Sequence, residues 1–155
     1  MTERLAHVGH LARRFLGSLS RRPPDVDDEG WAIGWLSPGE VALWQRMGNA
    51  DRRHAIDVAR RFTARRPQAG RPEVAGVLLH DVGKVDSALG PIDRVMATVV
   101  GPRRSRGRYA RYHDHEAIGA DLCVAAGSDP LTAAVVRGEG APDELLTALH
   151  EADEI

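Results

Sequence analysis

The sequence predicts an all-α protein, folded as a compact bundle of about six to eight helices. Alanine, leucine, valine and arginine are abundant, whereas aromatic residues make up 5% of the 155 residues. Short runs that alternate polar residues with β-branched or aromatic ones, the usual sign of strands, are nearly absent. Apolar residues instead recur at helical spacing, between residues that commonly begin and end helices.

Residues 1–36 are expected to form an N-terminal helix and a connector. Residues 2–19 place their apolar side chains on one helical face. Residues 21–24, Arg-Arg-Pro-Pro, end this helix because proline cannot donate a backbone hydrogen bond. Residues 25–30 are acidic and contain glycine, so we interpret them as the connector to a single globular unit over residues 37–155.

The globular unit is expected to begin with a well-capped helix. Ser37, Pro38 and Glu40 form the pattern of a capping box, with proline at the first helical position. Residues 49–51, Asn-Ala-Asp, are predicted to break the chain and to cap a second helix. This second helix is expected to run to about Arg66.

Two further helices and two loops are expected in the middle of the chain. Residues 67–72 are predicted to form a loop, followed by a short, strongly apolar helix over 73–80. We expect that helix to close near Gly83, since glycine accepts the left-handed conformation common at helix ends. A proline opens the next predicted helix, over 91–100. Residues 101–108 are expected to form a basic loop with four arginines.

Three helices are expected at the C-terminal end. The first covers residues 113–126 and ends at Gly127. Residues 129–130, Asp-Pro, are predicted to cap the second, which ends near Gly138. Pro142 is predicted to start the third. The last helix is expected to bury three leucines: Leu145, Leu146 and Leu149.

Composition excludes several classes of protein. The formal net charge is −1, so no overall charge draws the chain to nucleic acid or membranes. Cys123 is the only cysteine, which excludes an internal disulfide and a cysteine-based zinc cluster. No apolar run reaches the roughly 18 residues of a membrane span. We therefore expect a cytoplasmic protein with no membrane partner.

The segment from Val77 to Lys84 is the most informative for chemistry. It reads Val-Leu-Leu-His-Asp-Val-Gly-Lys, so an apolar helix ends in an imidazole beside a carboxylate. A buried helix rarely ends in two such groups without a partner for them. Lys84 follows, where an ammonium group could meet a phosphate. The alternative is an ordinary helix end at which Asp81 simply pairs with Lys84.

This segment and its flanking residues resemble the HD-domain superfamily of metal-dependent phosphohydrolases. The resemblance covers residues from about 37 to 155 and implies a helical bundle of the HD-domain type. It rests on the order and context of the motifs rather than on the His-Asp dipeptide, which is common. The matching residues are His54, the His80-Asp81 pair with Gly83 and Lys84, His115 with Gly119, and Asp153 after Ala152.

The resemblance implies a metal site and a reaction. Its four ligands would be His54, His80, Asp81 and Asp153. Imidazoles with carboxylates suit one divalent transition metal, Mn, Fe, Co, Ni or Zn, better than Mg or Ca. The implied reaction is hydrolysis of a phosphomonoester, a nucleotide or another small phosphate ester, by a water that the single metal activates.

Three residues are expected to act in catalysis. Asp81 would orient the water, and Lys84 would neutralise the substrate phosphate. His115 helps to hold a second ion in family members with two metals. In this chain we expect it to protonate the leaving group or to bind phosphate instead.

The sequence departs from the family where a second metal would bind. Members with two metals often carry a His-His-Glu run before the last aspartate. Residues 136–139 of this chain read Val-Arg-Gly-Glu, which favours a single metal. The missing histidines, and the position of Asp153 at the end of the sequence, leave an alternative open. In that alternative the domain is a catalytically silent binding or regulatory module.

The arginines of the basic loop are further candidates for phosphate binding. Arg104 and Arg108 could clamp a phosphate bidentately if the loop folds over the site. Without such folding, the loop is a solvated surface segment. It is too short and too poor in aromatic residues to favour a nucleic-acid partner. We therefore expect a small-molecule phosphate substrate, and the sequence leaves the oligomeric state open.

Overall fold

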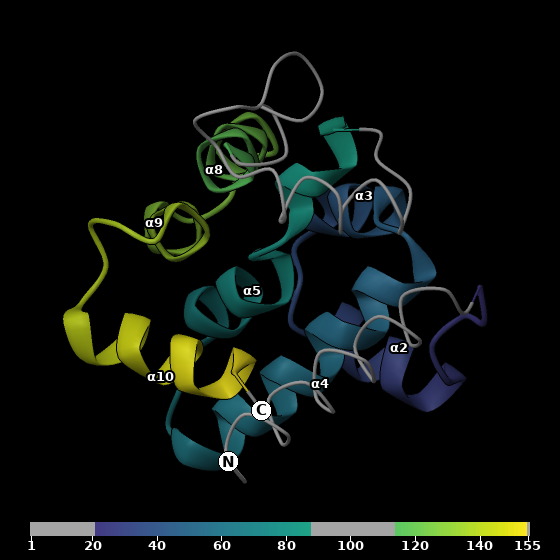
Figure 1. The fold of residues 1–155 in the computed structure, drawn as a ribbon, viewed down its shortest axis with the longest axis horizontal. Coiled ribbons are helices and arrows are strands. Elements are labelled where there is room, and N and C mark those ends of the chain that lie inside the picture. The colour runs from purple at the N-terminus through teal and green to yellow at the C-terminus, as the bar shows by residue number, and fades with distance from the viewer. Residues whose placement is uncertain (1–20, 88–113, 155) are drawn as a thin grey trace, which may run out of the picture.

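The computed structural model describes residues 21–87 and 114–154 of the chain. These residues form seven α-helices and one 3-10 helix, with no strand among them, so the predicted all-α bundle is confirmed (Figure 1). The expected N-terminal helix, the helix over 91–100 and the arginine loop lie outside the described residues. The elements are α2 (Val26–Gly34), α3 (Pro38–Arg46), α4 (Asn49–Arg65), α5 (Arg71–Leu79), the 3-10 helix η1 (Val82–Ser87), α8 (His115–Ala125), α9 (Pro130–Arg137) and α10 (Asp143–Asp153).

Helix α5 is the central element of the bundle. Six consecutive residues of α5, from Val74 to Leu79, are buried. Helices α4 and α9 both pack against α5, whereas α8 packs on α9 and η1, and α10 packs on α4 (Figure 1). Trp44 and Phe62 are the largest fully buried side chains of the core. None of the described helices is long and apolar enough to cross a membrane.

Most of the predicted helix ends are confirmed. Ser37 and Glu40 form the expected capping box: the Ser37 backbone amide donates to the Glu40 carboxylate at 2.7 Å, and the Ser37 hydroxyl accepts from the Glu40 amide at 3.4 Å. Asp129 caps α9 through the Leu131 amide, and Gly138 ends it in the left-handed conformation, with φ of 74°. Helix α4 differs, because its N-cap is Gly48, with no side-chain cap bond.

The predicted connector over residues 25–30 is wrong, since α2 occupies this segment. Asp25 is the N-cap, and its carboxylate accepts from the Asp27 amide at 3.0 Å. The acidic residues that follow stand in the first turn, where the helix dipole favours negative charge. Glu29 also accepts hydrogen bonds from Trp44 and Arg52, each at 2.7 Å, and these tie α2 to the core. An aspartate cap followed by acidic residues was the sequence signal for this helix.

The prediction that a left-handed Gly83 ends α5 is also wrong. The helix begins at Arg71, inside the predicted loop, and its C-cap is His80 in ordinary right-handed geometry. The chain then continues directly into η1, which contains Gly83. The glycines with positive φ in the described residues are Gly127, Gly138 and Gly140. Gly83 is therefore needed for close packing rather than for a left-handed turn, as the contacts below show.

The buried thiol of Cys123 provides a test of the core. Burial raises the pKa of this thiol to about 11, from an ordinary value of 9.0. Cys123 is expected to be inert to a disulfide reagent at pH 8 in the folded protein and to react at once after unfolding. The folded protein holds the thiol proton more tightly than the unfolded chain does. The contribution of Cys123 to the free energy of unfolding should therefore be fully present below pH 9 and fade as the pH rises toward 11. Rapid labelling of the folded chain at pH 8 would contradict this burial.

Candidate metal centre

Three of the four predicted metal ligands meet at the C-terminal end of α5. His80 caps this helix, Asp81 follows it, and His54 lies on α4. One donor atom from each residue lies within 4.8 Å of the other two. The rings of His54 and His80 are tilted, with their centroids 5.7 Å apart. Among the described residues, this is the one cluster of histidine, cysteine or acidic side chains spaced to hold a metal.

His80 has the environment of a metal-binding imidazole. Its Nδ1 lies 2.8 Å from the carbonyl oxygen of Val77, and a carbonyl can only accept, so Nδ1 carries the proton. Nε2 of the neutral ring then holds a free lone pair. This atom is buried and has no hydrogen-bond partner. A backbone bond that sets the tautomer and leaves the other nitrogen free is the usual support of a histidine ligand, so the site fits a metal.

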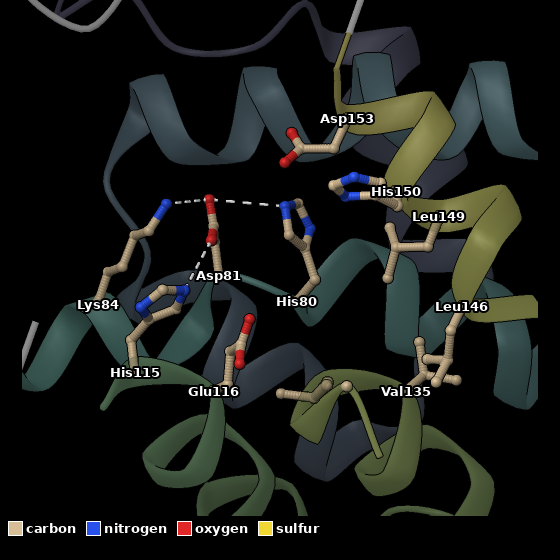
Figure 2. Close-up of a pocket in the computed structure, with 12 residues that line it drawn as sticks. His80, Asp81, Lys84, His115, Glu116, Val135, Leu146, Leu149, His150 and Asp153 are labelled. Carbon is tan, nitrogen blue, oxygen red and sulfur yellow. Dashed lines mark hydrogen bonds and ion pairs between the residues drawn. The ribbon is translucent and has the colours of Figure 1, made fainter. Parts of the chain in front are cut away.

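Asp81 is a buried carboxylate, 5% exposed, with Lys84 and two imidazoles around it. The Lys84 ammonium donates to its Oδ2, the Nε2 of His80 lies 3.6 Å from Oδ2, and the Nε2 of His115 lies 3.6 Å from Oδ1 (Figure 2). Burial alone raises the pKa of Asp81. Attraction to the Lys84 ammonium first, then the interactions with His80, the Lys84 hydrogen bond and His115, outweighs burial and holds this pKa far below its ordinary value. The carboxylate is therefore ionised at neutral pH.

Two glycines allow His115 to approach Asp81. A Cβ atom on Gly83 would stand 1.8 Å from the His115 carbonyl oxygen and 2.7 Å from the backbone nitrogen of Gly119. A Cβ on Gly119 would in turn lie 3.1 Å from the backbone nitrogen of Gly83. The backbones of η1 and α8 thus touch at these positions, and this contact places His115 beside Asp81.

Asp153, the fourth predicted ligand, reaches the cluster through His54. Its Oδ1 lies 2.8 Å from the Nε2 of His54, although the two residues are 99 positions apart in the chain. Asp153 lies outside the group of three whose donor atoms are mutually close. Arg61 fixes the same end of α10, because its Nε donates to the Ala152 carbonyl at 2.7 Å.

A pocket of about 390 Å³ opens beside the cluster. Its lining comes from the end of α5, from η1, and from α8, α9 and α10 (Figure 2). The pocket holds the predicted catalytic residues Asp81, Lys84 and His115 together with Asp153. Arg104 and Arg108, the other predicted phosphate ligands, lie outside the described residues.

Residues 136–139, where two-metal members of the resembled family often carry histidines, lie at the end of α9. Arg137 points to Asp121, with its guanidinium 2.8 Å from the carboxylate, and this pair is exposed. Gly138 lines the pocket in the left-handed conformation and contributes no side chain. Residues 136–139 therefore supply no imidazole to the pocket.

Several residues that line the pocket were not among the predicted site residues. Glu116 and the exposed His150 both line it (Figure 2). His150 stands three residues before Asp153, a helical spacing that could place it near the site, although a surface position was the expectation. Leu146 and Leu149 were predicted to be buried with Leu145, but only Leu145 is buried. They line the pocket because α10 packs on α4 rather than on α9. A pattern of apolar residues cannot distinguish a core wall from a pocket wall.

In comparisons with protein-family models, curated proteins and solved structures, no match to this chain was found.

Proposed function

We propose that this protein is a metal-dependent phosphohydrolase of the HD-domain type, acting on a small phosphomonoester such as a nucleotide. The observation that carries the proposal is the convergence of His54, His80 and Asp81 beside a pocket. His54 comes from α4 and the His80-Asp81 pair from the end of α5, and the Nε2 of His80 is buried without a hydrogen-bond partner. A buried polar atom left unsatisfied is costly, so a bound ligand is the simplest explanation.

The donor set favours a transition metal. Two imidazoles and one carboxylate match Mn, Fe, Co, Ni or Zn, whereas Mg and Ca prefer oxygen ligands alone. Asp153 would either bind the metal as a fourth ligand or orient the His54 ring through their hydrogen bond. When bound, the ion would supply Lewis acidity toward a phosphate oxygen and toward water. One cluster in the described residues supports one ion.

The remaining side chains suit a phosphate. Lys84 and His115 stand on either side of Asp81 and can donate to phosphate oxygens entering the pocket (Figure 2). His115 is also placed to give a proton to the departing alcohol. Asp81 remains ionised beside these groups, so it can accept a hydrogen bond from an attacking water.

The proposal is tested by metal content and turnover together. Protein purified without added metal is expected to contain about one transition-metal ion per chain. It should also hydrolyse members of a nucleotide and phosphomonoester panel when Mn, Fe, Co, Ni or Zn is supplied. A folded chain that binds none of these metals and turns over no ester contradicts the proposal. That result would favour the silent binding or regulatory module.

A further inference from the structure

The carboxylates that line the pocket differ in what they contact. The lining contains Asp81, Glu116 and Asp153. Asp81 accepts from Lys84, and Asp153 lies against His54. Among the described residues, no side chain donates to the carboxylate of Glu116. Glu116 is therefore the carboxylate of the described lining that is left to receive a donor from a ligand.

Glu116 stands beside the groups that suit a phosphate. It follows His115 in the first turn of α8, and the Nε2 of His115 lies 3.6 Å from Asp81. In the view of Figure 2, the Glu116 side chain lies between His115 and Val135, and all three line the same pocket of about 390 Å³. A phosphate held by Lys84 and His115 would bring its organic group within reach of Glu116.

Open space adjoins the Glu116 carboxylate at the end of α9. A Cβ atom on Gly138 would lie 3.9 Å from the Oε2 of Glu116 and would meet no other described atom within 4 Å. Gly138 has a positive φ of 74°, a conformation that residues with a side chain rarely adopt. Position 138 therefore leaves room for a ligand group beside the carboxylate.

The exposure and charge of Glu116 indicate the kind of donor. Because Glu116 is exposed, a neutral donor such as a hydroxyl would mainly replace water at its carboxylate. An ammonium group adds attraction between opposite charges, which is modest at an exposed site. Lys84 is the one ammonium of the described lining, against three carboxylates. One divalent ion would only balance these charges, and a bound phosphate adds negative charge again, so a positive group on the ligand is favoured.

We propose that the substrate is a phosphate monoester whose organic group carries an amino group, positively charged at neutral pH. Its phosphate lies by Lys84 and His115, and its ammonium group donates to Glu116. This inference rests on the proposed function and narrows it, since it makes Glu116 a residue that selects the organic group. The hydrolysis of the phosphate ester is unchanged.

Two phosphonates of the same length test this inference, because they resist hydrolysis and report binding alone. 3-Aminopropylphosphonate ends in an ammonium group, whereas 3-hydroxypropylphosphonate ends in a neutral hydroxyl that also donates. Their dissociation constants with the metal-loaded protein can be measured by calorimetry. The amino compound is expected to bind about five-fold more tightly, which is the upper end for an exposed pair of opposite charges.

A conservative variant locates the preference. Glu116→Gln keeps the size and an acceptor oxygen but removes the charge, so the two compounds should bind it with equal affinity. Glu144→Gln is the matched control, because Glu144 is exposed in the first turn of α10 and lies outside the pocket lining. This control should keep the wild-type ratio. Because the ratio compares two ligands on one protein, it cancels the effect of the lost charge on the phosphonate itself.

The possible outcomes separate the two proposals. If the wild-type protein binds the hydroxyl compound as tightly as the amino compound, the amino-bearing substrate is overturned and the phosphohydrolase stands. A Glu116→Gln variant that keeps the wild-type ratio has the same consequence. A metal-loaded chain that binds neither compound overturns the phosphate site itself, and the amino-bearing substrate with it. Circular dichroism verifies that both variants fold, and the wild-type ratio tests the proposal even if one does not.

Discussion

Replacing Gly83 with alanine is expected to lower the free energy of unfolding by about 3 kcal/mol, at the upper end for overpacking in a protein core. The added methyl group would stand 1.8 Å from the His115 carbonyl oxygen and 2.7 Å from the Gly119 nitrogen. Both obstacles are backbone atoms of α8, which cannot rotate away as a side chain would. Relief requires η1 and α8 to separate, and α8 carries His115 toward Asp81.

Thermal and denaturant unfolding measure this change, and a drop in Tm of about 10 °C is expected. Gly30→Ala is the matched control. Gly30 lies inside α2, and a Cβ there would meet nothing within 4 Å. Because glycine is a poor residue for a helix interior, this control should stabilise the protein by about 0.5–1 kcal/mol. A Gly83→Ala variant as stable as the wild type would contradict the backbone contact between η1 and α8.

Replacing Asp81 with asparagine is expected to abolish metal retention and to lower phosphohydrolase activity about a thousand-fold or more, since several kcal/mol of charge stabilisation is lost. The side chains have nearly the same shape, so packing is preserved. The amide, however, removes the negative charge that faces His80, Lys84 and His115. In the proposed metal site it would also replace an anionic ligand by a weak one. Metal per chain and initial rates on one phosphomonoester are the measurements.

Asp57→Asn provides the same charge change at an exposed position of α4. It should retain the metal, the activity and the stability of the wild type, because an isolated exposed charge contributes little. If Asp81→Asn keeps both its metal and its rate, Asp81 is not a ligand. The Asp81–Lys84 pair would then be only the structural end of α5, which is the alternative that the sequence leaves open.

The helix ends show where local rules suffice. The capping box at Ser37, the cap at Asp129 and the end of α9 near Gly138 were predicted correctly, because each depends on hydrogen bonds within a few residues. The same rules failed over residues 25–30, where acidic composition was given more weight than the cap at Asp25. Helix α2 is also held by bonds from Trp44 and Arg52, which no local pattern reveals.

The site shows where local rules end. The adjacency of His80 and Asp81 after a buried apolar run is a property of the sequence, as are the candidate partners His54, His115 and Asp153. The resemblance to a known family assigned expected roles to these residues, but it did not show how far apart their side chains lie. Leu146 and Leu149 could not be assigned to a pocket from their spacing, because their exposure depends on which helix α10 packs against.

The sequence by itself therefore determined the all-helical class and most of the helix boundaries among the described residues. These follow from periodicity and capping, which act over a few residues. The candidate metal and phosphate ligands came instead from the resemblance to a known family. Only the tertiary structure brought His54 within reach of His80 and placed Asp153 against His54. It also buried the Nε2 of His80 without a hydrogen-bond partner. It also gave Gly83 its role, because the approach of two backbones depends on how helices pack across the chain.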